Sequence, residues 1–124
     1  MGPYSSLKSS DYEVQGKDAS KPEYFVAIAL ERLKIPYEFQ YKIGFGHRVI
    51  GGFVVDFLAY TVPFPTPIWV HGEYWHSAAQ SAKDKLQQNM IRHFMNGQIM
   101  PAIVVWEDEI PTVEDAVNIL RERL

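Results

Sequence analysis

Two apolar stretches of this chain are interrupted by charged or histidine side chains at positions where a strand should be buried. Residues 69–76 read Trp-Val-His-Gly-Glu-Tyr-Trp-His, so two histidines and one glutamate fall within six positions of a strand-like run. Asp56 likewise lies inside the apolar run 53–58, Phe-Val-Val-Asp-Phe-Leu. A buried carboxylate is costly to desolvate unless a partner or a metal ion compensates its charge. Two strands that both break their own hydrophobic pattern therefore indicate a functional site.

The size and composition of the chain are those of one soluble globular domain. It has 124 residues, of which 47% are hydrophobic and 22% are charged, and no apolar run approaches the ~18 residues of a membrane span. We find no signal peptide, internal repeat or low-complexity tract. These features predict a cytoplasmic, intracellular protein that does not associate with a membrane.

The lack of cysteine limits the metal chemistry that is open to the chain. With no cysteine, disulfides and thiolate metal sites are excluded, and a metal ion must be bound by oxygen or imidazole ligands. Such ligands favour a hard ion, Mg²⁺ or Mn²⁺.

The charge of the chain argues weakly against a nucleic-acid partner, because the formal net charge is −3 and phosphate-binding surfaces are usually basic. A local basic face can outweigh the total, and most acids of the C-terminal part fall between residues 107 and 122. We expect the basic face on the side of the sheet that bears Asp56, with the acidic C-terminal helix turned away. The candidate DNA-binding residues are Lys42, Arg48, Lys83, Lys85 and Arg92, of which the last three are most simply the solvated face of a helix.

Local signals divide the chain into an arm and one folded domain. Residues 1–19 are polar without a sustained period and predict a flexible N-terminal arm, followed by a single domain at 20–124. Ser20 and Glu23 form a capping box that opens a helix, and Pro36 closes it. The further expected elements are strands at about 37–43, 53–60 and 68–75, a helix at about 77–95, a central strand at 99–106 and a final helix capped by Thr112.

The order of these elements is α-β-β-β-α-β-α, and the last strand joins the sheet through a helix. Such a crossover requires one parallel pairing in an otherwise antiparallel sheet. We therefore predict an α/β fold with a mixed four-stranded sheet flanked by helices. The crossover helix is expected to bury Ala82, Leu86, Met90 and Phe94.

The register of the strand hairpin decides which polar side chains meet. If the hairpin is symmetric about its proline-rich turn, Asp56 lies opposite Gly72 or Glu73, and the period of two places His71 on the same face as Glu73. Glu23 lies on the apolar stripe of the first helix and should face the sheet. This register gathers Asp56, His71 and Glu73 into one cluster, with Glu23 as a fourth candidate.

Such a cluster meets the physical requirements of phosphodiester hydrolysis. A divalent ion bound by Asp56 would offset charge on the scissile phosphate and lower the pKa of a bound water. An imidazole titrates near neutral pH and can take the proton from that water.

Three segments together resemble the very short patch repair endonucleases of the PD-(D/E)XK, or restriction-endonuclease-like, superfamily. They are the strand 53–58, the string Ile-Trp-Val-His-Gly-Glu-Tyr-Trp-His at 68–76, and the strand end Ile-Val-Val-Trp-Glu at 103–107. A long helix containing Asp84, followed by Gly97, separates the last two segments and belongs to the same resemblance. The similarity covers roughly residues 20 to 110. It implies a restriction-endonuclease-like fold, Mg²⁺-dependent cleavage of DNA, and a place in DNA repair.

The resemblance also implies roles for individual residues. Asp56 matches the metal-binding aspartate, and Val70 matches the residue whose main-chain carbonyl contacts the metal. His71 matches the histidine that activates the attacking water, and His76 matches a second histidine near the phosphate. Glu23 matches a glutamate held by metal-bound water.

Other positions of the resemblance bear on specificity. Tyr74 and Trp75 match an aromatic pair that wedges against bases, and Glu73, at a position that is not usually acidic in those enzymes, is a candidate metal ligand. The zinc site of the repair enzymes, which needs cysteine, and the superfamily lysine two residues after an acid are both missing. Phosphodiester cleavage is therefore predicted, and mismatch specificity is not.

Each candidate also has a purely structural interpretation, and the alternative function is a non-catalytic nucleic-acid-binding or assembly module that retains the fold. The structural interpretations are Glu23 as a helix cap, Asp56 as a turn former, Glu73 as an edge charge, His71 and His76 as ordinary histidines, Tyr74 and Trp75 as core, and Asp84 as the partner of a lysine.

Overall fold

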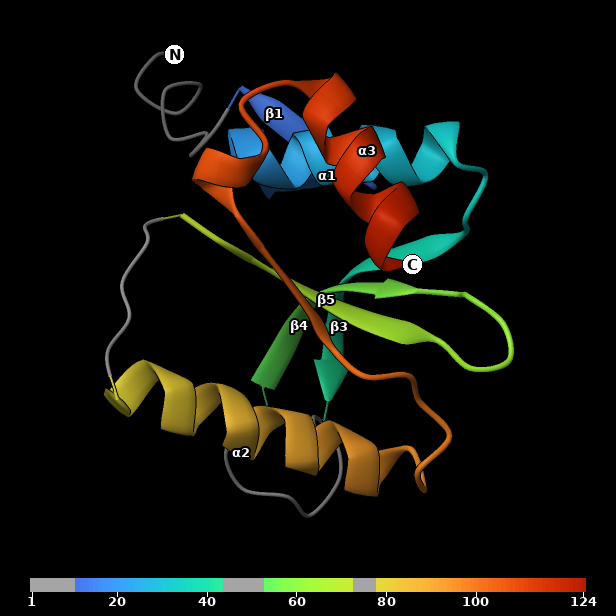
Figure 1. Ribbon diagram of the computed structural model, residues 1–124, viewed down its shortest axis with the longest axis vertical. Helices are drawn as coiled ribbons and strands as arrows, with labels where there is room; N and C mark the ends of the chain where they lie inside the picture. Colours follow the sequence, from blue (N-terminus) through green and yellow to red (C-terminus); the bar gives the residue numbers. More distant parts are fainter. Residues whose placement is uncertain (1–10, 44–52, 73–77) are drawn as a thin grey trace, which may run out of the picture.

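The computed structural model describes residues 11–43, 53–72 and 78–124. Figure 1 shows a sheet with α1 and α3 above it and α2 below it. In chain order the elements are β1 (Tyr12–Val14), β2 (Lys17–Ala19), α1 (Lys21–Arg32), β3 (Tyr37–Ile43), β4 (Phe53–Ala59), β5 (Thr66–His71), α2 (Ala78–Phe94), β6 (Ile103–Trp106), the 3₁₀ turn η2 (Glu107–Glu109) and α3 (Val113–Arg123).

The main sheet has the strand order β3-β4-β5-β6. The first three strands are antiparallel, and β6 pairs in parallel with β5 after the crossover through α2. The predicted α/β class, the mixed four-stranded sheet and its one parallel pairing are confirmed. The prediction that the last strand is central is wrong, because β6 lies at an edge of the sheet. Its sequence is apolar throughout because Ile103 and Val105 pack against the core under α1 and α3, while Val104 packs against the core over α2.

Both terminal helices begin where their capping residues predict. The Ser20 hydroxyl accepts a hydrogen bond from Glu23 N at 3.3 Å, and the Glu23 carboxylate accepts one from Ser20 N at 2.8 Å. Thr112 caps α3 by accepting from Asp115 N at 3.2 Å. Each cap satisfies donors that a helix start leaves unpaired, which stabilises the helix by about 1 kcal/mol. Among the described residues, no helix is both long enough and apolar enough to cross a bilayer.

Two hydrophobic clusters hold the helices to the sheet. The cluster under α1 and α3 joins Leu30 and Leu120 of the helices to Phe39 and Phe57 of the strands, and all four are fully buried. Burial of each such side chain contributes roughly 1.5–3 kcal/mol. The smaller cluster over α2 consists of Ile43, Val55, Trp69 and Ile91.

Side chains of β4 change faces at Asp56. Phe57 packs in the cluster under α1 and α3, but Val55, two residues away, packs in the cluster over α2. Residues two apart share a face in a regular strand, so the strand must be irregular at the residue between them. Gln40, opposite Asp56 by count in β3, has a left-handed φ of 56°, and the β3–β4 ladder skips this pair. Asp56 therefore lies at a local twist of the sheet.

The flexible-arm prediction is wrong for residues 12–19, which form the antiparallel β1–β2 hairpin; residues 1–10 lie outside the described residues. Gln15, at the hairpin turn, donates from its side-chain amide to Tyr37 O and accepts from Phe39 N, both at 2.9 Å. Polar side chains of this segment thus take the place of a further strand at the outer edge of β3. Because the segment has no apolar period, its sequence does not indicate this role.

The predicted buried face of α2 is also wrong. Leu86 is 60% exposed and Phe94 is 37% exposed, whereas Ile91 is 1% exposed. Ala82 is exposed as well. The face of the helix that meets the sheet carries Ile91 and, seven residues earlier, Asp84. A carboxylate therefore points toward the sheet.

Candidate active site

Asp56 is fixed by the backbone of the neighbouring strand. Its Oδ2 accepts a hydrogen bond from Val70 N at 2.8 Å, just beyond the last β4–β5 backbone pair, Phe57 with Ile68. The predicted register, with Asp56 opposite Gly72 or Glu73, is wrong. β5 begins at Thr66, earlier than predicted, and Thr66 pairs with Ala59, which moves the partner of Asp56 several positions toward the turn.

The environment of Asp56 disfavours its charge. Burial raises its pKa from 3.8 to about 6, the hydrogen bond from Val70 acts in the opposite direction, and the nearby Glu23 carboxylate raises it further. Glu23, in the first turn of α1, is near enough for its charge to act on Asp56, while its Oε1 caps the helix at Ser20. Two carboxylates, one of them largely desolvated, share this part of the protein.

His71 lies in a second environment, between β6 and α2. The β5–β6 ladder pairs it with Trp106, and the centroids of the two rings are 4.8 Å apart. Its Nε2 is buried without a hydrogen-bond partner, and Asp84 Oδ2 lies 3.7 Å away. Because Nε2 is closed to solvent, a proton taken from water would have to reach the other ring nitrogen, Nδ1.

Asp84 is the residue that sequence reasoning missed. Its sequence context suggests only a pairing with a neighbouring lysine, whereas its side chain is 25% exposed and faces His71. Asp84 lies seven residues before Ile91, the apolar residue that anchors α2. This spacing places both residues on the same face of the helix and is the sequence signal that Asp84 faces the sheet.

The structure brings some of the predicted site residues together and separates others. Asp56 lies with Val70 and Glu23, whereas His71 lies with Asp84 and Trp106. The two sets occupy neighbouring strands, and the register that would have gathered Asp56 and His71 into one cluster is not formed. Glu73, Tyr74, Trp75, His76 and Arg48 lie outside the described residues.

The described residues contain no group of three or more histidine or acidic side chains arranged to hold a metal ion. The chemistry of the Asp56 and Glu23 pair nevertheless fits a hard divalent ion. Both donors are carboxylates, and burial disfavours the charged form of Asp56. A divalent cation would compensate the charge of such a pair.

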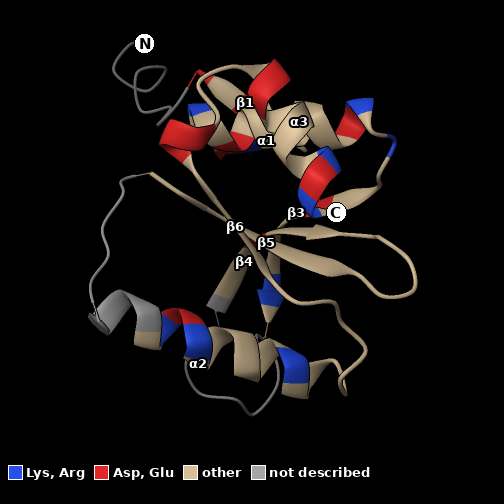
Figure 2. Ribbon diagram, viewed as in Figure 1, with Lys and Arg blue, Asp and Glu red and all other residues tan. Residues whose placement is uncertain are grey.

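Acidic side chains gather mainly in the helical layer of α1 and α3, although both layers carry charges of both signs. Lys83, Lys85 and Arg92 are exposed on α2, and Lys42 is exposed near the end of β3. Figure 2 shows blue segments on α2 and near the end of β3, while most red segments gather on α1, η2 and α3, which carry blue segments as well. The acidic C-terminal helix thus lies in the layer opposite α2. Asp56, however, has its carboxylate neighbour in the acidic layer.

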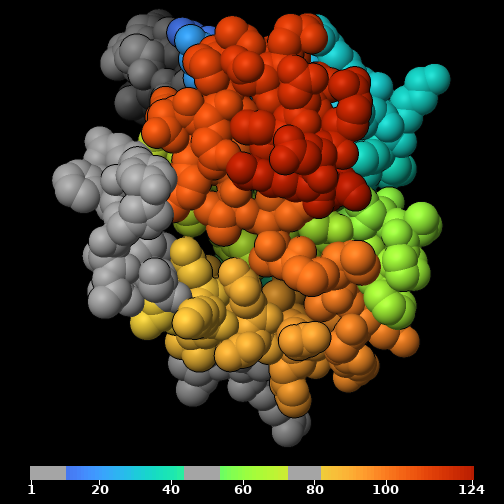
Figure 3. All heavy atoms as spheres, in the orientation of Figure 1, coloured from blue at the N-terminus to red at the C-terminus, as the bar shows by residue number. Residues whose placement is uncertain are grey.

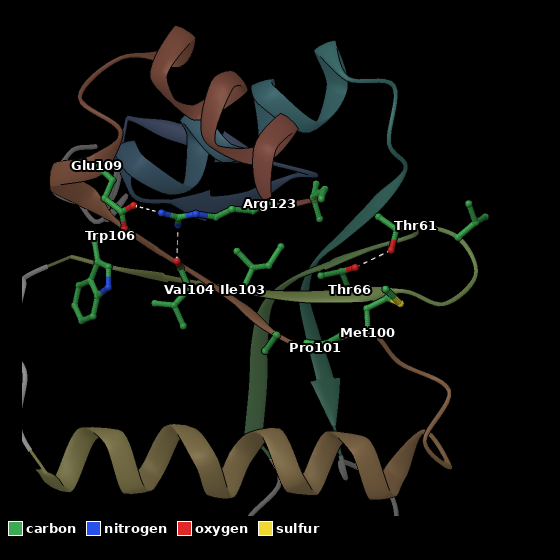
Figure 4. Close-up of a pocket in the computed structure, with 12 residues that line it drawn as sticks. Thr61, Thr66, Met100, Pro101, Ile103, Val104, Trp106, Glu109 and Arg123 are labelled. Carbon is green, nitrogen blue, oxygen red and sulfur yellow. Dashed lines mark hydrogen bonds and ion pairs between the residues drawn. The ribbon is translucent and has the colours of Figure 1, made fainter.

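A groove of about 680 Å³ follows the outer edge of β6. It lies between the β4–β5 turn, the segment that leads into β6 and the C-terminal end of α3, on the face that Figure 3 presents. Figure 4 shows Arg123 and Glu109 on its upper side and Trp106 at one end. The groove does not include Asp56, but Trp106 connects it to His71.

No protein-family model, curated protein or solved structure matches this chain. Its function therefore has to follow from the chemistry of its own side chains.

Proposed function

We propose that this protein is a Mg²⁺- or Mn²⁺-dependent endonuclease of the restriction-endonuclease-like class that hydrolyses phosphodiester bonds in DNA. The observation that carries the proposal is the carboxylate of Asp56. It lies inside a strand, is fixed by the N–H of Val70, and has a pKa raised to about 6 by burial and by the charge of Glu23. Burial opposes the ionisation of this carboxylate, and a bound divalent ion would favour it.

The metal would be held by Asp56 and the main-chain carbonyl of Val70, with Glu23 acting through a water molecule. When bound, the ion would offset charge on the scissile phosphate and make an attacking water more acidic. The α1 capping box keeps Glu23 in place, because its carboxylate is already tied to the start of the helix.

His71 is the proposed general base. Asp84 Oδ2 lies 3.7 Å from its Nε2, so the charge of the Asp84 carboxylate can stabilise the imidazolium that forms when the ring takes up a proton. Nδ1 is then the atom that takes the proton from water. Lys83, Lys85 and Arg92 on α2 are the proposed phosphate contacts, because phosphate binding needs exposed cations and α2 supplies three.

The test is nicking of supercoiled plasmid by the purified protein, with Mg²⁺, with Mn²⁺ and with a chelator, and in parallel on single-stranded and branched DNA. Cleavage is expected only with a divalent ion. Asp56→Asn keeps an oxygen that accepts from Val70 N but removes the charge, and it should slow cleavage by at least about 100-fold.

Two further variants sharpen the result. Glu23→Gln should retain the capping box, since glutamine serves at this position, and should slow cleavage without a loss of helix stability. Glu38→Gln removes an exposed acid of β3 and should cleave at the wild-type rate. Metal-independent cleavage, or cleavage by Asp56→Asn at the wild-type rate, would refute the proposal. DNA binding without any cleavage would favour the non-catalytic binding module.

A further inference from the structure

On its Nε2 side, the imidazole of His71 is held by packing and not by a hydrogen bond. Its Nε2 has no hydrogen-bond partner, and the nearest carboxylate oxygen, of Asp84, lies 3.7 Å away, beyond hydrogen-bond length. The ring contact with Trp106, at 4.8 Å between centroids and 49° between planes, falls in the range of attractive aromatic pairs. The position of Trp106 therefore bears directly on the orientation of His71.

Trp106 belongs to an edge strand, and its backbone is held from the outer side by two charged side chains. Trp106 N donates to Glu109 Oε1 at 3.2 Å, and Val104 O accepts from Arg123 Nη1 at 3.0 Å. Glu109 and Arg123 are themselves joined in an ion pair. Figure 4 shows this arrangement along the groove. The pair thus replaces the neighbouring strand that β6 lacks.

We propose that the Glu109–Arg123 pair is a positioning unit which, through Trp106, fixes the imidazole of His71. The inference rests on the proposed role of His71 as general base. The pair connects α3 and η2 to β6, Trp106 connects β6 to His71, and neither charged residue is a catalytic residue. Loss of the pair frees the outer side of β6 and lets the Trp106 ring move, and a displacement of about 1 Å at a catalytic group can cost about 100-fold in rate.

The experiment combines plasmid nicking with proton NMR of the His71 ring, assigned by comparison with His71→Gln. A tryptophan ring at this distance shifts the imidazole protons by its ring current, which reports the contact whether or not the protein cleaves DNA. Glu109→Ala should lose most of this shift and slow nicking by about 10- to 100-fold. Glu109→Gln keeps the acceptor for Trp106 N and should retain most of the ring-current shift and most of the nicking rate.

The matched control is the exposed ion pair between Arg32 and Glu114, with 2.5 Å between Nη1 and Oε1. It also involves α3, and Glu114→Ala should change neither readout. Trp106→Phe should retain a ring-current shift and most of the rate, whereas Trp106→Leu should lose both.

The proposal is overturned if Glu109→Ala keeps the ring-current shift of the wild-type protein, or if Glu109→Ala and Glu114→Ala reduce the rate equally. Should the wild-type protein not nick DNA, the proposed function fails, and the NMR arm alone still decides whether the ion pair positions His71.

Discussion

The carboxylate of Asp56 and the backbone N–H of Val70 form a hydrogen bond of 2.8 Å between β4 and β5. The bond lies just beyond the last backbone pair of these strands, so a side chain takes the place of a carbonyl as the acceptor. This arrangement satisfies a partly buried N–H, which would otherwise cost free energy. It also fixes a carboxylate at the twist of the sheet, where burial opposes its ionisation.

Stability is expected to fall as the pH rises through about 6. The pKa of Asp56 is raised from 3.8 to about 6, mainly by burial, so the folded protein binds this proton more tightly than the unfolded chain. The stabilisation is complete below about pH 4 and is lost as the pH passes the folded-state pKa. The rise corresponds to at most about 3 kcal/mol.

Urea unfolding at steps between pH 4 and pH 8 measures this effect, with Asp56→Asn as the comparison because it cannot ionise. The free energy of unfolding of the wild-type protein should drop relative to that of Asp56→Asn across this range. Above pH 6, added Mg²⁺ should restore stability to the wild-type protein alone, because the ion binds the ionised carboxylate. Parallel curves for the two proteins would contradict the raised pKa.

The contact between His71 and Asp84 predicts coupled losses of activity. His71→Ala should slow cleavage by about 100- to 10,000-fold, the range for a positioned general base. Asp84→Asn should cause a smaller loss, and the double variant should be no slower than His71→Ala, because Asp84 acts only through the histidine. His93→Ala, an exposed histidine of α2, is the control. Wild-type activity of Asp84→Asn would remove Asp84 from the mechanism.

His76 allows a further comparison in the same assay. It lies outside the described residues, and His76→Ala should resemble His71→Ala if His76 contacts the phosphate. Near-wild-type rates for both histidine variants would return the two residues to ordinary structural roles.

The sequence predicted those parts of the fold that depend on local rules. The capping box at Ser20 and Glu23 and the cap at Thr112 form as predicted, because each needs only residues three apart. The single parallel pairing also followed from element order alone.

The errors concern features that depend on contacts between distant segments. The β1–β2 hairpin has no apolar period, and its link to the sheet is the pairing of Gln15 with the backbone of β3. The register at Asp56 depended on where β5 begins, a boundary that a proline-rich turn leaves open. The separation of Asp56 from His71 follows from that register and from the twist at Asp56, neither of which residue type alone can indicate.

The orientation of α2 gives a direct test of packing. Ile91→Ala should lower the free energy of unfolding by about 2–5 kcal/mol, because it leaves a cavity between α2 and the sheet. Leu86→Ala, in the same helix but 60% exposed, should change it by less than about 0.5 kcal/mol. Both values come from urea unfolding at pH 7. Equal losses, or a larger loss for Leu86→Ala, would mean that α2 packs through the face predicted from its sequence.

Binding to DNA should depend on salt through the basic face of α2, since the formal net charge of the whole protein is −3 and only a local surface can attract phosphates. The affinity for duplex DNA is expected to fall with a log-log salt slope of about −0.9 for each phosphate contacted. Alanine at Lys83, Lys85 or Arg92 should reduce the slope by about 1 wherever that residue touches a phosphate. Arg121→Ala removes an exposed cation from the acidic layer and should leave the slope unchanged.

The salt dependence is measured by fluorescence anisotropy with labelled duplexes at several salt concentrations. An affinity that does not change with salt, or equal effects of Arg121→Ala and the α2 variants, would contradict the assignment of α2 as the DNA-binding surface and favour an assembly module.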